Sequence, residues 1–251
     1  MAQKTRLEVC IDSVESAMEA ENGGAHRVEL CSGLIEGGTT PTLGMFRQVK
    51  KVTAIDVFVI IRPRSADFCY DPMEVEVMKE NICIFKEAGA SGIVLGALTK
   101  EGRVDRQLTA ELVALARPLP VTFHRAFDMA VDLVQALEDL VELGIERVLT
   151  SGGESTCLEG LPMLAQLVKQ AANRIIVVPG GGITEKNLDR ILSGCQASEF
   201  HASCRTRVKN SVMTFRNSSV KMGASLSPAE FSHKVSDAST VSRMMAIADN
   251  A

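Results

Sequence analysis

Short apolar runs alternate along the chain with longer segments in which apolar residues recur at helical spacing. Each run is rich in β-branched residues and closes on polar or glycine residues, which is typical of the strands of a parallel sheet. The eight runs expected as strands are Leu7–Ile11, Arg27–Leu30, Val57–Ile61, Gly92–Leu95, Val121–His124, Arg147–Thr150, Ile175–Val178 and Glu199–Ala202. Because eight strand–helix units can close on themselves, the pattern predicts an α/β fold, a TIM-type (β/α)8 barrel.

The length of the chain fits one domain. It has 251 residues, and eight-unit barrels commonly form a single core of about 250 residues. We expect the barrel over about residues 6–204, a long loop at 205–226 and C-terminal helices at 227–249. In such a barrel the functional side chains lie at the carboxyl ends of the strands, which confines the candidate site to eight short windows.

Composition narrows the class of partner. The chain carries 27 basic and 31 acidic residues, a balance that does not favour nucleic acid or an acidic membrane as partner. It has no tryptophan and one tyrosine, so it lacks stacking platforms for single-stranded nucleic acid. No apolar run approaches the ~18 residues of a membrane span. Seven cysteines, an odd number, favour reduced thiols in the cytoplasm over disulfides.

Alternation along the first two strands predicts polar side chains inside the barrel. Glu8 and Cys10 lie on the face opposite the apolar one in the first strand, and Glu29 and Cys31 repeat this arrangement in the second. Two adjacent strands therefore each present a carboxylate and a thiol to the interior.

A carboxylate inside a barrel is costly unless it is paired. Arg62 and Arg64 follow the third strand, and we predict that one of them pairs with Glu8 or Glu29. Such pairing would form a structural ion-pair layer, and a ligand-binding role is the alternative interpretation.

The fifth strand ends in a histidine, an arginine and an aspartate. His124, Arg125 and Asp128 place an imidazole, a guanidinium and a carboxylate at the predicted rim. The histidine would act as an acid–base group, a metal ligand or a neutral hydrogen-bond donor. A purely structural histidine is the simpler alternative.

Three cysteines come from strands that would be neighbours in a closed barrel. Closure places the eighth strand beside the first, so Cys204 would approach Cys10 and Cys31 at the strand spacing of about 4.8 Å. Soft thiolates are the ligands that Cu(I) prefers, and His124 or His201 would be additional donors. The alternative is that each cysteine packs as a small buried hydrophobic residue.

A run of glycines follows the seventh strand. Gly180, Gly181 and Gly182 lie where barrels commonly bind phosphate through backbone amides, and a side chain there would block the approach. We expect a site for a small anionic ligand, a phosphate or a carboxylate, with a tight packing turn as the alternative.

Several ordered motifs together resemble the copper homeostasis protein CutC family. They include Leu-Glu-Val-Cys at 7–10, Arg-Val-Glu-Leu-Cys-Ser-Gly-Leu at 27–34, Ile-Arg-Pro-Arg at 61–64, Thr-Phe-His-Arg-Ala-Phe-Asp at 122–128 and Pro-Gly-Gly-Gly-Ile-Thr at 179–184. Phe-Arg-Asn at 215–217 is similar to the animal members. The resemblance implies a TIM-type barrel, an intracellular protein of the cytoplasm and nucleus, a homo-oligomer such as a tetramer, and a role in copper tolerance or trafficking with Cu(I) as the bound ion.

The resemblance also marks residues, and three functions follow as hypotheses. The residues that match the family's polar rim and its thiols are Glu8, Glu29, Arg62, Asp67, His124, Arg125, Asp128, Cys10 and Cys31. The first hypothesis is a Cu(I)-binding homeostasis protein. The second is an isomerase or lyase for a phosphorylated or carboxylated small molecule, with Glu8 or Glu29 as base, His124 as acid, and Arg62 with the glycine turn as anion clamp. The third is an oligomeric scaffold.

Overall fold

The structure is a computed structural model that describes residues 5–217, 219–220 and 230–251. The strands are β1 (Arg6–Ile11), β2 (Arg27–Leu30), β3 (Asp56–Ile60), β4 (Gly92–Leu95), β5 (Val121–Phe123), β6 (Arg147–Thr150), β7 (Ile176–Pro179), β8 (Glu199–Ala202), β9 (Arg207–Asn210) and β10 (Ser232–Val235). The α-helices are α1 (Val14–Asn22), α2 (Leu43–Val52), α3 (Pro72–Glu87), α4 (Arg106–Ala116), α5 (Leu133–Glu142), α6 (Leu161–Ala171), α7 (Leu188–Cys195) and α8 (Ala238–Ala248).

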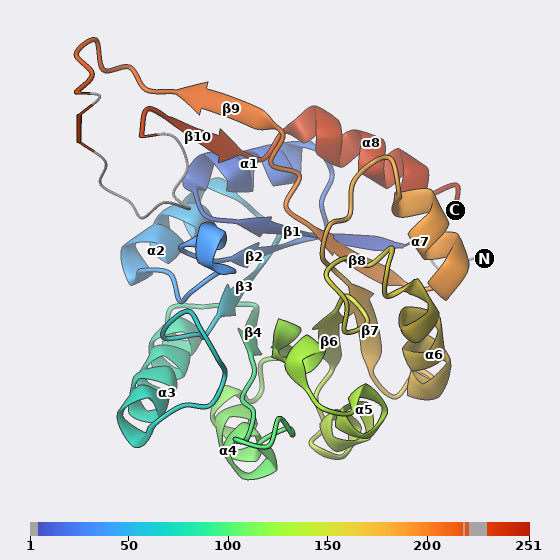
Figure 1. Cartoon of the computed structure of the whole chain (residues 1–251). Helices are drawn as coiled ribbons and strands as arrows, with labels where there is room; N and C mark the ends of the chain where they lie inside the picture. The colour runs from blue at the N-terminus through green and yellow to red at the C-terminus, as the bar shows by residue number, and fades with distance from the viewer. Residues whose placement is uncertain (1–4, 218, 221–229) are drawn as a thin grey trace.

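Strands β1 to β8 form one parallel sheet that curves into a barrel, with helices around the outside (Figure 1). Strand β1 pairs with β2 on one side and with β8 on the other, so the last barrel strand lies beside the first. A bridge between Gly180 and His201 joins β7 to β8. The predicted TIM-type barrel is confirmed. Four of the eight barrel strands have the predicted boundaries, and the other four differ by one residue at one or both ends.

The two faces of the strands bury different side chains. Leu7, Val9 and Ile11 are fully buried in the layer between the strands and the helices. The opposite face points into the barrel, where a smaller apolar cluster fills part of the interior. Its members are Cys10, Cys31, Phe58, Ile60 and Val94. The rest of the interior is polar, so the barrel has an apolar sector and a charged sector side by side.

The segment after β8 differs from the predicted loop and helices. Residues 207–210 form β9, which pairs antiparallel with β10, and this two-stranded arm lies beside α1 (Figure 1). Arg207 and Lys209 are two residues apart in β9 and therefore lie on the same face of the strand. Both bind Glu15 on α1 at 2.6 Å. Residues 218 and 221–229 of the predicted loop and helices lie outside the described residues. Among the described residues that follow β9, helix is found only at Ala238–Ala248. Helix α8 packs on α1 and α7.

No helix within the described ranges has both the length and the apolar character needed to cross a membrane.

Candidate functional site

A charged layer closes the floor of the barrel. Arg27 Nε donates to Glu8 Oε2 at 2.5 Å, and its Nη2 donates to Glu199 Oε2 at 2.6 Å. Arg147 Nε reaches the same Glu199 oxygen at 3.2 Å. The guanidinium of Arg27 also lies 4.7 Å from the ring centroid of Phe58. All these groups are buried or nearly so, and the parallel register places Arg27 directly opposite Glu8.

The pKa values of the floor residues follow from this pairing. Burial alone would raise the pKa of Glu8, but Arg27 and His201 together lower it to about 2. Burial would lower the pKa of Arg27, while Glu8 and Glu199 raise it above its usual range. Glu8 is therefore an ionised structural carboxylate, which does not fit the predicted role of general base.

The predicted partners of the interior carboxylates were wrong. Arg62 donates to backbone carbonyl groups of the loops around it, and Arg64 pairs with Glu74 at 2.5 Å. Strand β3 ends at Ile60, so both arginines lie beyond the sheet rather than on its inner face. Arg27 has the same parity as the interior carboxylates and was missed as their partner, although alternation along β2 contained that signal.

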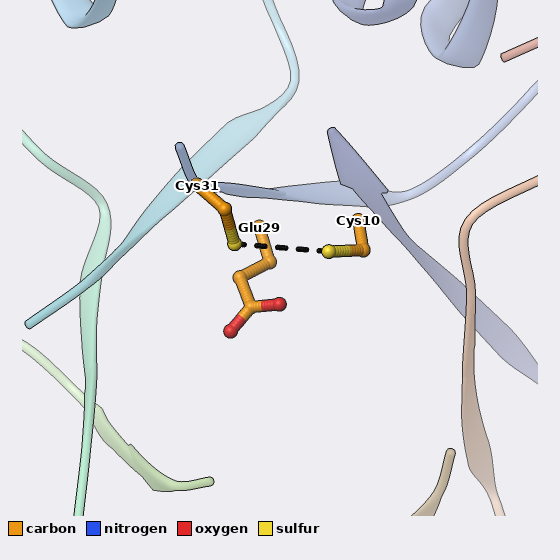
Figure 2. A group of neighbouring side chains, drawn as sticks. All are labelled: Cys10, Glu29 and Cys31. Carbon is orange, nitrogen blue, oxygen red and sulfur yellow. Dashed lines mark hydrogen bonds between the residues drawn. The ribbon is translucent and has the colours of Figure 1, made fainter. Parts of the chain in front are cut away.

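Above the floor, two thiols and a carboxylate form a cluster (Figure 2). Cys10 Sγ lies 3.7 Å from Cys31 Sγ, and Glu29 projects between the strands below them. The ligand atoms of the three side chains all lie within 4.8 Å of one another. All three residues are buried inside the barrel, on the face that alternation along the first two strands predicts.

The two thiols titrate as a coupled pair. Hydrogen bonding with Cys31, and then the neighbouring His201, together lower the pKa of Cys10 to about 5 against the opposing effect of burial. The same bond, together with burial, raises the pKa of Cys31 well above its usual value. Burial and the neighbouring Cys10 also raise the pKa of Glu29. At neutral pH Cys10 is therefore a thiolate, while Cys31 keeps its proton.

His201 connects the thiol cluster to the charged floor. Its Nδ1 lies 2.7 Å from Glu8 Oε1, and its Nε2 lies 3.7 Å from Glu29 Oε2. Burial would lower the pKa of His201, but Cys10 and Glu8 raise it well above the usual value. The protonated imidazole therefore faces the Cys10 thiolate, and Glu8, Glu29 and His201 form a second group with donor atoms within 4.8 Å.

Cys204 does not join the other two thiols. Its Sγ lies 3.5 Å from Met244 Sδ in α8, and it belongs to the outer core. Strand β8 ends at Ala202, and Cys204 takes a left-handed backbone conformation with φ of 49°. By alternation it shares the outward face of Phe200 and Ala202, so barrel closure does not bring its side chain inside. The predicted three-sulfur site is therefore limited to Cys10 and Cys31.

His124 is buried at the end of β5 and is neutral. Burial, and then the charge of Arg62, lower its pKa to about 3. Its Nδ1 accepts a hydrogen bond from the amide of Ala126 at 3.1 Å, so the single proton is on Nε2. His124 has no imidazolium proton to give at neutral pH, which leaves the neutral hydrogen-bond donor among its predicted roles.

Asp128 organises the loop after β6. Its carboxylate accepts from the amides of Ser151 and Gly153, at 3.0 and 3.1 Å, and from Arg125 Nε at 2.7 Å. Arg125 also donates to Ser151 Oγ at 2.6 Å. Asp128 is thus fully engaged within the loop, and its geometry supports a positioning role.

The glycine turn after β7 packs closely against its neighbours. A side chain on Gly181 would come within 3.3 Å of the Arg125 guanidinium, and one on Gly182 would come within 3.0 Å of Thr156. Both glycines have positive φ, and Gly180 donates to the carbonyl of Thr150 at 2.9 Å. Packing therefore requires these glycines, and the predicted anion site at the turn stays a prediction.

A cavity of about 160 Å³ at the mouth of the barrel connects several of these groups. Its polar lining residues are Cys10, Glu29, His201, Arg62, His124 and Arg125. Apolar side chains complete the wall; these are Ile60, Phe68 and Leu149. Of the predicted site residues, Cys10, Glu29, Arg62, His124 and Arg125 meet at this cavity. The others do not line it; these are Glu8, Cys31, Asp128, Gly180, Gly181, Gly182 and Cys204.

Comparison with known proteins places the chain among its relatives. The model of the CutC family matches residues 5–206. The chain belongs to the CutC family. It is 60% identical to the copper homeostasis protein cutC homolog of Mus musculus over 242 residues, covering 96% of this chain and 89% of that one. It is 58% identical to the Homo sapiens homolog over 244 residues, covering 97% and 89%.

Solved structures agree with this assignment. The crystal structure of a CutC protein from Streptococcus agalactiae is 31% identical with a TM-score of 0.76, and the match covers 79% of this chain and 98% of that one. The N-(5'-phosphoribosyl)anthranilate isomerase of Pyrococcus furiosus is 14% identical with a TM-score of 0.59, covering 98% and 100%. This second likeness concerns the fold alone.

Proposed function

We propose that this CutC family member acts in copper homeostasis and binds one Cu(I) ion between Cys10 and Cys31. The observation that carries the proposal is the pair of buried sulfur atoms 3.7 Å apart. Two metal–sulfur bonds of about 2.3 Å each, the length of zinc–thiolate bonds, reach across this distance. Soft thiolate ligands suit Cu(I) better than they suit hard divalent cations.

The protonation of the cluster supports binding of a monovalent cation. One thiolate, Cys10, is already present at neutral pH, and Cu(I) needs to displace only the proton of Cys31. The exchange of one proton for one monovalent cation leaves the buried charge unchanged. Glu29 and His201 lie beside the sulfurs and are the candidates for a third contact.

The relatives support the wider part of the proposal. Two mammalian proteins that are 58% and 60% identical over nearly the whole chain are named copper homeostasis protein cutC homologs. The same resemblance supports a cytoplasmic location with the nucleus as a second one, and a homo-oligomer such as a tetramer. The isomerase or lyase alternative keeps its support from the polar cavity, with Cys10 or Glu29 in place of Glu8 as base. The scaffold alternative stays a prediction.

Titration with Cu(I) under anaerobic conditions, against a chromophoric chelator of known affinity, tests the metal site. Wild-type protein is expected to bind one ion per chain. Cys10→Ser or Cys31→Ser is expected to weaken binding by more than ~100-fold, because loss of an outer-shell partner alone costs 10- to 100-fold. Unchanged affinity in both variants would refute the assignment.

Two other cysteines serve as matched controls. Cys204→Ser and Cys157→Ser each remove a buried thiol away from the cluster, so both are expected to keep wild-type affinity. A loss of binding in Cys204→Ser equal to that in Cys10→Ser would point back to a three-sulfur site. The cellular role can be tested in cells that lack the protein and are supplied with either the wild type or Cys10→Ser. Their growth would be compared over a series of copper concentrations.

A further inference from the structure

Arg62 is a buried cation without a carboxylate partner. Arg62 is only 6% exposed. Its Nη1 donates to the carbonyl groups of Glu36 and Gly38, both at 2.8 Å. Its Nη2 reaches the carbonyl of Ala66 at 3.3 Å. Within the part of the chain that the structure describes, no acidic side chain forms an ion pair with Arg62. Carbonyl dipoles orient the guanidinium but leave its charge uncompensated, which is costly inside a protein.

Two donor groups on this wall have no acceptor among the described residues. They are Arg62 Nε and His124 Nε2, and both are buried. His124 accepts at Nδ1 from the amide of Ala126, so Nε2 carries a proton that it does not donate. Both side chains are near the same aromatic ring: the Phe68 centroid lies 5.1 Å from the Arg62 guanidinium and 5.1 Å from the His124 ring. Unpaired buried donors are rare and call for a partner that the protein itself does not supply.

Both side chains line the cavity at the mouth of the barrel. Its volume of about 160 Å³ equals roughly five water molecules at ~30 Å³ each. This space admits a molecule of only a few carbon atoms. Ile60 and Leu149 supply apolar wall, so the ligand combines a small apolar part with an acceptor-rich end.

The donors of this wall match a carboxylate better than a phosphate. One uncompensated positive charge, on Arg62, fits one negative charge. A phosphate dianion would call for more donors than the two that are free here. Arg125, the other arginine at the cavity, is already paired with Asp128 and is partly exposed. A second acceptor on the ligand would meet the Nε2–H of His124.

We propose that the cavity binds a small carboxylate whose charge is held by Arg62 Nε and whose neighbouring oxygen accepts from His124 Nε2. A hydroxy or oxo group next to the carboxylate supplies that oxygen. The donors of this site are separate from the thiols, so the proposal does not depend on copper binding. It differs from the predicted anion site at the glycine turn, because its donors are two buried side chains rather than backbone amides.

Isothermal titration of the purified full chain with lactate, pyruvate, acetate and inorganic phosphate tests the site. Lactate or pyruvate is expected to bind more tightly than acetate, and phosphate more weakly than either. Arg62→Gln is expected to weaken lactate binding by ~10- to 100-fold, the usual value of a hydrogen bond to a charged group. The control Arg64→Gln removes an arginine that is paired with Glu74, and binding is expected to be unchanged.

A second measurement covers the case in which Arg62→Gln does not fold. In histidine-labelled wild-type protein, the carbon-bound ring proton resonances of His124 are expected to shift on addition of lactate, while those of the exposed His233 stay in place. Tighter binding of phosphate than of any carboxylate would overturn the proposal, as would equal lactate affinity in Arg62→Gln and wild type. Absence of binding, together with an unmoved His124 resonance, would also overturn it. None of these outcomes bears on Cu(I) binding by Cys10.

Discussion

Replacing Arg27 by methionine tests whether the charged floor holds the barrel together. Methionine keeps much of the side-chain length but removes the cation that lies 2.5 Å from Glu8 and 2.6 Å from Glu199. Two carboxylates are then left in a buried layer, with His201 beside one and Arg147 beside the other. Breaking a buried ion pair by removing one partner typically costs 3–5 kcal/mol of folding free energy.

The pKa of Glu8 gives an independent magnitude. A shift from 4.5 in the unfolded chain to about 2 in the folded protein corresponds to about 3 kcal/mol at neutral pH. Because the folded pKa is depressed, this contribution is fully present above pH 4.5 and is lost as the pH falls toward 2. We therefore expect Arg27→Met to lower the free energy of unfolding by about 3–4 kcal/mol at pH 7. The difference in unfolding free energy between wild type and Arg27→Met should be smaller by about 1 kcal/mol at pH 3.5 than at pH 7.

Urea unfolding followed by circular dichroism at both pH values measures the effect. The matched control is Arg106→Met, which removes an arginine that binds Asp139 at 2.6 Å and Glu142 at 2.7 Å but is 47% exposed. Solvent screening makes such surface pairs weak, so this control should lose much less stability. Equal losses in the two variants, or a deficit at Arg27 that does not change with pH, would refute the role assigned to the floor.

Two further predictions concern the thiols and the packing of the barrel. The logarithm of the Cu(I) affinity should rise by about one per pH unit between pH 6 and 8, because binding there displaces only the proton of Cys31. The slope should be steeper below pH 5, where Cys10 is protonated as well. An affinity that does not change with pH in chelator competition would contradict this prediction. Gly92→Ala places a methyl group 2.5 Å from the Phe58 ring and should cost about 1–3 kcal/mol in urea unfolding, whereas Gly44→Ala, with 3.9 Å of clearance in α2, should cost nothing. Similar stabilities for the two alanine variants would show that the barrel interior adapts.

The fold was predictable because two periods repeat along the chain. The strand and helix periods recur in eight successive units, and this is enough to locate every barrel strand. It is also enough to assign Glu8, Cys10 and Glu29 to the interior face of the barrel. Side-chain parity survives small errors in strand boundaries, since alternation continues along the whole strand. The prediction failed at Arg62, which lies past the end of β3, where the backbone turns and alternation no longer says which way a side chain points. It failed at Cys204 for another reason: alternation along β8 already puts this residue on the outward face, and barrel closure does not turn it inward.

Ion-pair partners need more information than parity. Arg27 meets Glu8 because β1 and β2 pair in one register, and a shift by one residue would put Arg27 on the other face. That register is fixed by the whole barrel and is not written in either strand. The neutrality of His124 likewise depends on burial and on the nearby Arg62, which come from different units of the fold.

The interior is ordered by charge from the floor to the mouth, and this order allows two ligands in one cavity. In the floor, Glu8 and Arg27 compensate each other. In the middle, the Cys10 thiolate is balanced by the protonated His201, and the replacement of the Cys31 proton by Cu(I) adds no net charge. At the mouth the charge of Arg62 therefore stays uncompensated whether or not copper is bound. A carboxylate bound there would neutralise that charge, so the two proposed ligands have no electrostatic reason to exclude each other.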